Sequence, residues 1–231
     1  MLFDTYISNK SEYPHLVFLA KEGYELLLNT EDFFLVRFAN CNIYAAETRF
    51  LGKDTSPDAL KAREMLISSL ASLHPSLLET TDEGIYDALR SKYTNGYGCF
   101  QYDLSSIGES DINIRLLKAK DLDFTIETYG SEDYMRRLFS EDRILGYYDN
   151  KNLIGYIARH VDGTLGALYV TEDMRNKGYG SKITKAAVAY YNDPYIYSQV
   201  IDDNAASIQM HVKMNAHKCE KKIYWLYDNG F

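Results

Sequence analysis

The chain has 231 residues, of which 46% are hydrophobic and 25% charged, and its formal net charge is −8. This composition is that of a globular protein, and the acidic balance argues against nucleic acid or an anionic membrane as a partner, because both favour a basic surface. Three widely spaced cysteines indicate neither a disulfide framework nor a metal site. No basic leader or long apolar run is present, so we expect a cytoplasmic protein with no membrane partner.

The first half of the sequence predicts a small α/β domain. Apolar residues recur at helical spacing before residue 28, and the alternating aromatic and aliphatic run that follows is typical of strands. Ser56 and Pro57 provide an N-cap and a favourable first helical residue. The expected elements are a helix at 14–28 bent near Gly23, strands at 33–38 and 42–46 around a turn at 40–42, helices at 57–73 and 82–92, and a strand at 97–104.

A domain boundary is predicted between residues 103 and 111, where small and polar residues show little periodicity. The resulting domains cover residues 1–108 and 109–231. The first carries 9 basic and 15 acidic residues and the second 16 and 18, so the second half is the less acidic one. An anionic ligand would therefore meet less repulsion in the second half.

The second half predicts a mixed arrangement of strands and helices. Turn-forming residues at 149–152 and an Asp162-Gly163 pair separate three apolar stretches, which indicates successive hairpins. The expected elements are a strand at 112–117, helices at 120–129 and 131–139, strands at 144–148, 153–158 and 165–170, a helix at 181–191, a strand at 195–201, a helix at 204–214 and a strand at 222–227.

Residues 164–181 contain the clearest functional pattern, a strand followed by Arg175-x-x-Gly178-x-Gly180 and then a helix. The first N–H groups of a helix lack intrahelical partners and lie at the positive end of its dipole, so they bind anions such as a pyrophosphate. Glycines let the backbone approach such an anion, and Arg175 and Lys177 add positive charge. The alternative interpretation is that the two glycines only close the turn between strand and helix.

This pattern resembles the acyl-CoA-binding signature of the GNAT N-acyltransferases, whose core is Arg/Gln-x-x-Gly-x-Gly/Ala. A second signature follows in the order found in that family. Residues 199–216 resemble its fifth strand and next helix, in which Asn204, Ser207, Met210 and His211 occupy patterned positions. The resemblance covers roughly residues 112–227, and its last block looks closest to the glycine N-acyltransferase-like branch.

The resemblance implies a GNAT fold, an α/β (α+β) architecture with a central mixed, mostly antiparallel sheet flanked by helices. It implies that acetyl-CoA or another acyl-CoA is the co-substrate and that no metal takes part. The preceding smaller domain would then be a degenerate copy of the same fold. The cofactor-binding residues implied are Leu168, Tyr169, Val170, Arg175, Asn176, Lys177, Gly178, Tyr179, Gly180, Ser181, Asn204 and Ser207.

Two further roles are implied by the resemblance. Many relatives place a tyrosine seven residues after the asparagine to act on the departing thiolate, and His211 stands at that position. An imidazole could donate a proton or stabilise the sulfur anion as a cation, so His211 is the candidate catalytic residue. The alternative is that His211 only packs beside Met210. Asn204 would orient the pantetheine amide or only cap its helix.

The general base is not identified by the sequence. Related enzymes carry a Glu eleven residues before the loop arginine, whereas this chain has Thr164 there, and a threonine cannot act as a base. Asp162 lies nearby and is interpreted as the turn residue of the hairpin. Deprotonation of the amine would then go through ordered water or a group near the end of the 120–129 helix.

The sequence therefore predicts an acyl-CoA-dependent N-acyltransferase that transfers an acyl group directly to a primary amine in a ternary complex. A small-molecule amine is favoured over a protein as the acceptor, and a homodimer is compatible with the resemblance. The alternative is a non-catalytic CoA-binding or regulatory module, which the missing Glu and the substituted tyrosine would allow.

Overall fold

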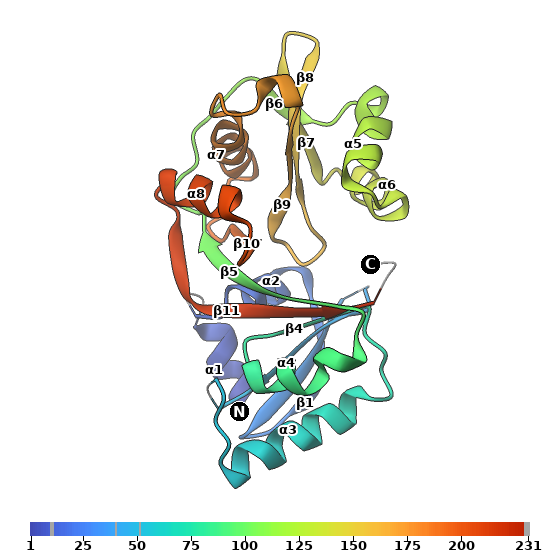
Figure 1. Ribbon diagram of the computed structural model, residues 1–231, viewed down its shortest axis with the longest axis vertical. Coiled ribbons are helices and arrows are strands. Elements are labelled where there is room, and N and C mark those ends of the chain that lie inside the picture. Colours follow the sequence, from blue (N-terminus) through green and yellow to red (C-terminus); the bar gives the residue numbers. More distant parts are fainter. Residues whose placement is uncertain (10–11, 40, 51, 229–231) are drawn as a thin grey trace. The chain divides into compact units, whose positions relative to one another are not determined.

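The computed structural model describes residues 1–9, 12–39, 41–50 and 52–228. The chain forms two compact units, and segments near the C-terminus return to the first of them. The first unit comprises Met1–Gln101, Ile201–Asp203 and Cys219–Phe231, and the second comprises Tyr102–Val200 and Asn204–Lys218 (Figure 1).

The first unit contains most of a seven-stranded mixed sheet with the order β1-β2-β3-β4-β11-β5-β10. Strands β3 and β4 are parallel, whereas β1 with β2, β2 with β3 and β4 with β11 are antiparallel. The elements are α1 (Leu2–Ser8), α2 (Pro14–Glu22), β1 (Tyr24–Asn29), β2 (Phe33–Phe38), β3 (Ile43–Thr48), α3 (Pro57–Leu70), β4 (Leu77–Thr80), α4 (Glu83–Leu89), the 3-10 turn η1 (Arg90–Lys92), β5 (Asn95–Asp103) and β11 (His217–Tyr227). The last strand in the sheet order, β10 (Tyr197–Ile201), belongs mainly to the second unit.

Helices cover both faces of the sheet of the first unit, as the alternation of side chains along β2 requires. Phe33 and Leu35 lie in the apolar cluster with α3 and α4. Phe34 points to the other face, where its ring meets Phe3 of α1 at 5.1 Å in a T-shaped contact. The expected start of α3 is confirmed, because the Ser56 side chain accepts a hydrogen bond from the backbone N–H of Ala59.

The second unit contains a four-stranded antiparallel sheet with the order β6-β7-β8-β9. Its elements are β6 (Ile114–Leu116), the 3-10 turn η2 (Ala119–Asp121), α5 (Leu122–Tyr129), α6 (Glu132–Ser140), β7 (Ile144–Asp149), β8 (Asn152–Arg159), β9 (Leu165–Val170), the 3-10 turn η3 (Glu172–Met174), α7 (Tyr179–Tyr191) and α8 (Ala205–Lys213).

The small sheet has α5 and α6 on one face and α7 on the other (Figure 1). Leu122, Met135 and Leu138 of α5 and α6 pack with buried residues of β7 and β8. On the opposite face Gly155 lies directly under α7. A Cβ at this position would be 2.8 Å from Cδ1 of Ile183 and 2.3 Å from the carbonyl oxygen of Tyr169. Glycine at 155 therefore sets how closely α7 approaches the strands.

The expected helix at 14–28 is wrong in its second part. Helix α2 ends at Glu22, Gly23 adopts a φ of +95°, and the following residues form β1, which pairs with β2. An apolar run with both helical and strand propensity takes its structure from the neighbouring strand in this case. Helix α1 and the short buried strand β4 were not expected, and Asn40 of the expected turn lies outside the described residues.

The expected strand at 222–227 exists but is longer and has other partners than we expected. It begins at His217, pairs antiparallel with β4, and lies between β4 and β5 in the large sheet. We expected it to complete the sheet of the second half.

The fold class is confirmed as an α+β fold with a mixed sheet and a second, smaller antiparallel sheet. Over the described ranges, none of the helices is both long and apolar enough to cross a bilayer.

Candidate functional site

Strand β9 is an edge strand of the small sheet, and its end has an open backbone. In the part of the chain that the structure describes, β8 is its one neighbouring strand. The Thr171 N–H donates to the carbonyl of Ile154 on β8 at 2.9 Å. Because peptide groups alternate in direction along a strand, the N–H and C=O of Val170 point away from β8. The expected carbonyl-binding segment therefore presents a polar edge.

A β-bulge precedes this open edge. Tyr156 pairs with Tyr169 and Ala158 pairs with Gly166, so a single β8 residue lies opposite two residues of β9. Ala167, one of those two, has a φ of +48°, which is uncommon for a residue with a side chain. The bulge changes the direction in which the last residues of β9 present their groups.

The expected anion-binding loop runs from η3 to the first residue of α7. Its arginine is tied to the strand, because Nε of Arg175 donates to the Val170 carbonyl at 3.1 Å. The guanidinium also lies over the Tyr169 ring at 5.3 Å. Asn176 and Gly178 have φ values of +62° and +83°, and a Cβ at 178 would meet no atom within 4 Å. The loop surface at Gly178 is therefore open.

Helix α7 begins directly after Gly178, which is its N-cap and provides no side chain to cap it. The first intrahelical bond is donated by the Lys182 N–H to the Gly178 carbonyl at 3.2 Å. The N–H groups of Tyr179, Gly180 and Ser181 therefore have no partner within the helix. The structure thus brings together the open end of β9, two cationic side chains and three N–H donors, all from sequence-predicted residues.

Helix α8 lies beside this helix start. A Cβ at Gly180 would be 2.9 Å from Sδ of Met210 and 3.7 Å from Cδ2 of Leu168, so the glycine allows α8, α7 and β9 to meet. Asn204 is the N-cap of α8, and its Oδ1 accepts from the Ser207 N–H at 3.1 Å. The capping role expected for Asn204 is therefore present, and the side chain itself is exposed.

His211 is buried in α8, with 4% of its surface exposed, and both ring nitrogens have partners. Nδ1 lies 2.8 Å from the Ser207 carbonyl oxygen, which can only accept, so Nδ1 carries the proton. Nε2 then accepts from the Ser198 hydroxyl at 2.7 Å. The ring also stacks on Tyr102 at 4.6 Å. Burial lowers the pKa of His211, and the Ser207 carbonyl only partly offsets this, so the imidazole is neutral near pH 7.

The position implied for the general base is buried. Thr164 donates to the carboxylate of Asp162 through both its backbone N–H at 3.0 Å and its hydroxyl at 2.8 Å. This is the side-chain geometry of an Asx turn, as expected for a hairpin turn residue. Both side chains are buried. A nearby pair, His160 and Tyr134, is joined by a 2.7 Å hydrogen bond at Nδ1.

A comparison with protein families identifies the segment that contains these features. Residues 115–216 match the model of the acetyltransferase (GNAT) family. Over this segment, which is less than half of the chain, the sequence is similar to the GNAT family. The match contains the open end of β9, the Arg175-to-Gly180 loop and helix α8, and it excludes the strands and helices of the first half. It does not distinguish a glycine N-acyltransferase-like branch. No curated protein matches the sequence.

Solved structures resemble the chain along its whole length. A Drosophila protein has 15% identity and a TM-score of 0.69, with 100% of this chain and 95% of that chain covered. An acetyltransferase of the GNAT family from Colwellia psychrerythraea has 13% identity, a TM-score of 0.52 and coverages of 97% and 92%. A GCN5-related N-acetyltransferase from Kribbella flavida has 9% identity, a TM-score of 0.52 and coverages of 94% and 93%. At these identities the likeness shows the fold alone.

Three residues of the segment that matches the family model are important to the site and were not singled out from the sequence. Gly155 sets the distance from α7 to the sheet, Ser198 bonds His211, and Ala167 forms the bulge. Gly155 is flanked by apolar residues on both sides in a strand pattern, which is a recognised sign of close backbone approach. No comparable signal marks Ser198 or Ala167.

Proposed function

We propose that the protein is an acyl-CoA-dependent N-acyltransferase that uses acetyl-CoA and acylates a primary amine by direct transfer in a ternary complex. The observation that supports this best is the continuity of the Val170 N–H, which points away from β8, with the Gly178 loop and the uncapped start of α7. A strand edge suits an extended arm with amide groups, and a helix N-terminus suits a diphosphate. Coenzyme A contains both parts in one molecule.

The residues of this chain fit such a ligand. An anion at the start of α7 would meet the N–H groups of Tyr179, Gly180 and Ser181, and the open surface at Gly178 would admit it. Arg175 and Lys177 are exposed beside this point and would add charge attraction. Asn204 and Ser207 would lie toward the amide arm, with Leu168, Tyr169 and Asn176 completing the surface.

Bound acetyl-CoA would supply the thioester. The backbone N–H of Val170 would donate to the thioester oxygen and stabilise the negative charge that develops there when the amine attacks. The amine must lose a proton, which would pass to ordered water or to a group at the end of α5, near Glu127. The acceptor favoured is a small-molecule amine, with a glycine N-acyltransferase-like specificity as the finer proposal.

The predicted role of His211 requires its ring to donate a proton to the departing thiolate or to stabilise it as a cation. Nε2 is an acceptor in the observed arrangement and cannot donate a proton to sulfur. A proton must first reach the imidazole, after which Nε2 would donate to Ser198 and the Ser198 hydroxyl would be released toward another acceptor. His211 would then act through Ser198 as well as through its own charge.

A second candidate function is a CoA-binding or regulatory module without catalysis. The specific observations in its favour are that Thr164 is buried against Asp162 and that His211 is buried and neutral. Neither side chain is available for proton transfer in this arrangement. Both candidate functions require the cofactor site, so they differ in turnover and not in binding.

Thermal unfolding of the full chain with and without acetyl-CoA tests the shared part of the proposal. A ligand that binds only the native state raises the Tm in a concentration-dependent way. The Tm shift should be lost in a double variant with Arg175→Ala and Gly178→Glu. A matched control is Gly130→Glu, because Gly130 also has a positive φ, +88°, with no atom within 4 Å of an added Cβ.

An unchanged shift in the double variant would refute the cofactor site. If the site is confirmed, release of free thiol in the presence of a panel of amines separates the two functions. Turnover of an amine supports the enzyme, whereas binding without turnover of any amine supports the regulatory module.

A further inference from the structure

Helices α3 and α4 of the first unit border a cavity whose lining residues lie outside the segment that matches the family model. Its volume is about 510 Å³, which is in the range of pockets that hold small molecules. The lining residues of α3 are spaced three and four residues apart, so they share one face of that helix. The lining residues of α4 have the same spacing and share one face of α4. The cavity is lined by Lys53, Thr55, Leu60, Arg63, Glu64, Ile67, Ser68, Gly84, Asp87 and Ala88.

Part of the cavity lining is apolar. Leu60 and Ile67 lie two turns apart on α3, and Ala88 lies on α4. Leu60 leaves 54% of its surface exposed, whereas Leu66 and Leu70 of α3 are buried in the apolar cluster. An apolar ligand body placed here would remove the Leu60 side chain from water, which is favourable in proportion to the area covered.

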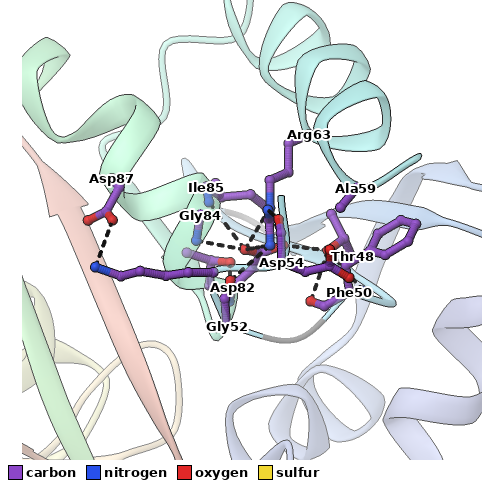
Figure 2. A network of polar contacts seen from close by, with 12 residues as sticks. Thr48, Phe50, Gly52, Asp54, Ala59, Arg63, Asp82, Gly84, Ile85 and Asp87 are labelled. Atoms are coloured by element: carbon purple, nitrogen blue, oxygen red, sulfur yellow. Dashed lines mark hydrogen bonds and ion pairs between the residues drawn. The ribbon is translucent and has the colours of Figure 1, made fainter. Parts of the chain in front are cut away.

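Two of the lining residues, Arg63 and Gly84, belong to a polar network (Figure 2). The Arg63 guanidinium binds both carboxylate oxygens of Asp82, at 3.0 and 3.1 Å from Nε, and donates to the carbonyls of Gly52 and Asp54. Asp82 also accepts from Thr48 and from the Gly84 N–H. All three guanidinium nitrogens are engaged, so Arg63 is not available to hold an anionic ligand.

The rim of the cavity already holds one ammonium group. Nζ of Lys53 lies 3.3 Å from a carboxylate oxygen of Glu83 and 3.3 Å from one of Asp87, both on α4. On the α3 side Glu64 is exposed, and no ion pair joins it to another of the described residues. The uncompensated charge at the rim is therefore negative, and it favours a cation over an anion.

We propose that the α3/α4 cavity binds a small amphipathic primary ammonium compound. Its apolar body would lie on Leu60, Ile67 and Ala88, and its ammonium group would pair with Glu64, as Lys53 pairs with Asp87. The site goes beyond the proposed acyl transfer and does not depend on it, because every lining residue lies outside residues 115–216. An amine bound here would be an effector and not the acceptor.

Titration of the full chain with 2-phenylethylammonium, followed by NMR or calorimetry, tests the proposal. The uncharged 2-phenylethanol and the anionic 3-phenylpropionate serve as ligands of similar shape. Glu64→Gln should weaken ammonium binding about fivefold, the effect of one partly exposed ion pair, and Glu220→Gln, an exposed acid on β11, should leave it unchanged.

The apolar contact has its own matched pair of variants. Leu60→Asn should weaken binding about tenfold because the covered apolar area is lost. Met65→Asn should not change it, because Met65 has a similar exposure, 49%, on α3 but does not line the cavity.

Equal binding of the alcohol and the ammonium compound would overturn the proposal, as would equal effects of the two members of either variant pair. Binding of a basic peptide in place of the small amine would also overturn it. The double variant with Arg175→Ala and Gly178→Glu separates this site from the proposed cofactor site. Ammonium binding that persists in it and is weakened by Leu60→Asn belongs to the α3/α4 cavity, whatever the outcome with acetyl-CoA.

Discussion

The imidazole of His211 accepts a hydrogen bond from the Ser198 hydroxyl across 2.7 Å while its own Nδ1–H is held by the Ser207 carbonyl. This arrangement fixes a neutral ring inside the second unit. Burial lowers the pKa of His211 below its ordinary value of 6.5. Between pH 6.5 and the lower pKa of the folded state, His211 is therefore protonated in the unfolded chain and neutral in the folded chain.

From this we predict that the free energy of unfolding decreases as the pH falls below 6.5. His211→Gln should reduce that slope by up to about 1.4 kcal/mol per pH unit, the value for one proton. Urea unfolding at a series of pH values measures it. His217→Gln, at an exposed position, is the control. A slope that is the same in the wild type and in His211→Gln would contradict the buried neutral ring.

Gly155→Ala should destabilise the second unit by about 1 to 3 kcal/mol, the usual effect of overpacking. The added Cβ would lie 2.3 Å from a backbone oxygen, which cannot move without displacing β9. Gly98→Ala provides the comparison, because its nearest contact would be 3.2 Å from a side-chain oxygen of Asp202. Chemical denaturation of both variants should rank Gly155→Ala as clearly less stable, and equal stabilities would argue against close packing of α7 on the sheet.

Arg63→Met should cost about 3 to 5 kcal/mol in the first unit because it leaves the Asp82 carboxylate buried without its cation. The two side chains expose 6% and 1% of their surface. For the exposed pair of Arg136 and Glu132, with 51% and 61%, Glu132→Gln should change stability by about 0.5 kcal/mol or less. Denaturant midpoints measure both effects. A small change in Arg63→Met would mean that the network contributes little to the fold.

Substitutions at Asn204 separate its two expected roles. Asn204→Ala should lower stability by about 1 kcal/mol because the Ser207 N–H loses its cap. Asn204→Ser restores a capping oxygen without the amide group. If the amide orients the cofactor, Asn204→Ser keeps the stability and loses acetyl-CoA affinity several-fold. An affinity that recovers together with the stability would reduce Asn204 to a helix cap.

The elements with strong local signals were predictable. Ser56-Pro57 marks the start of α3, and the turn residues at 149–152 separate β7 from β8 as expected. β4 was missed because a four-residue strand that is buried on both faces shows no alternation. Residues 24–28 were assigned to the wrong class because Leu26 and its neighbours suit either element, and pairing with β2 decides between them.

For the candidate site, the sequence predicted the residues of the loop and the helix start but not their surroundings. Gly178 adopts the positive φ that explains why a glycine is needed there. The partner of His211 was not predictable, because Ser198 lies on a different element and contacts it only through the folding of β10 against α8. The hydrogen bond from Arg175 to the Val170 carbonyl was likewise not predictable, because it depends on the conformation of the loop between them.

Strand β11 lies between β4 and β5, so the sheet of the first unit contains a strand that is synthesised after residues 102–200 of the second unit. Until residues 219–227 have been synthesised, β4 and β5 each have an unpaired edge. The sheet of the first half of the chain is incomplete during this time. Open edges of this kind invite pairing with other chains. A fragment of residues 1–108 should therefore aggregate when expressed alone and become soluble when a peptide of residues 217–228 is supplied.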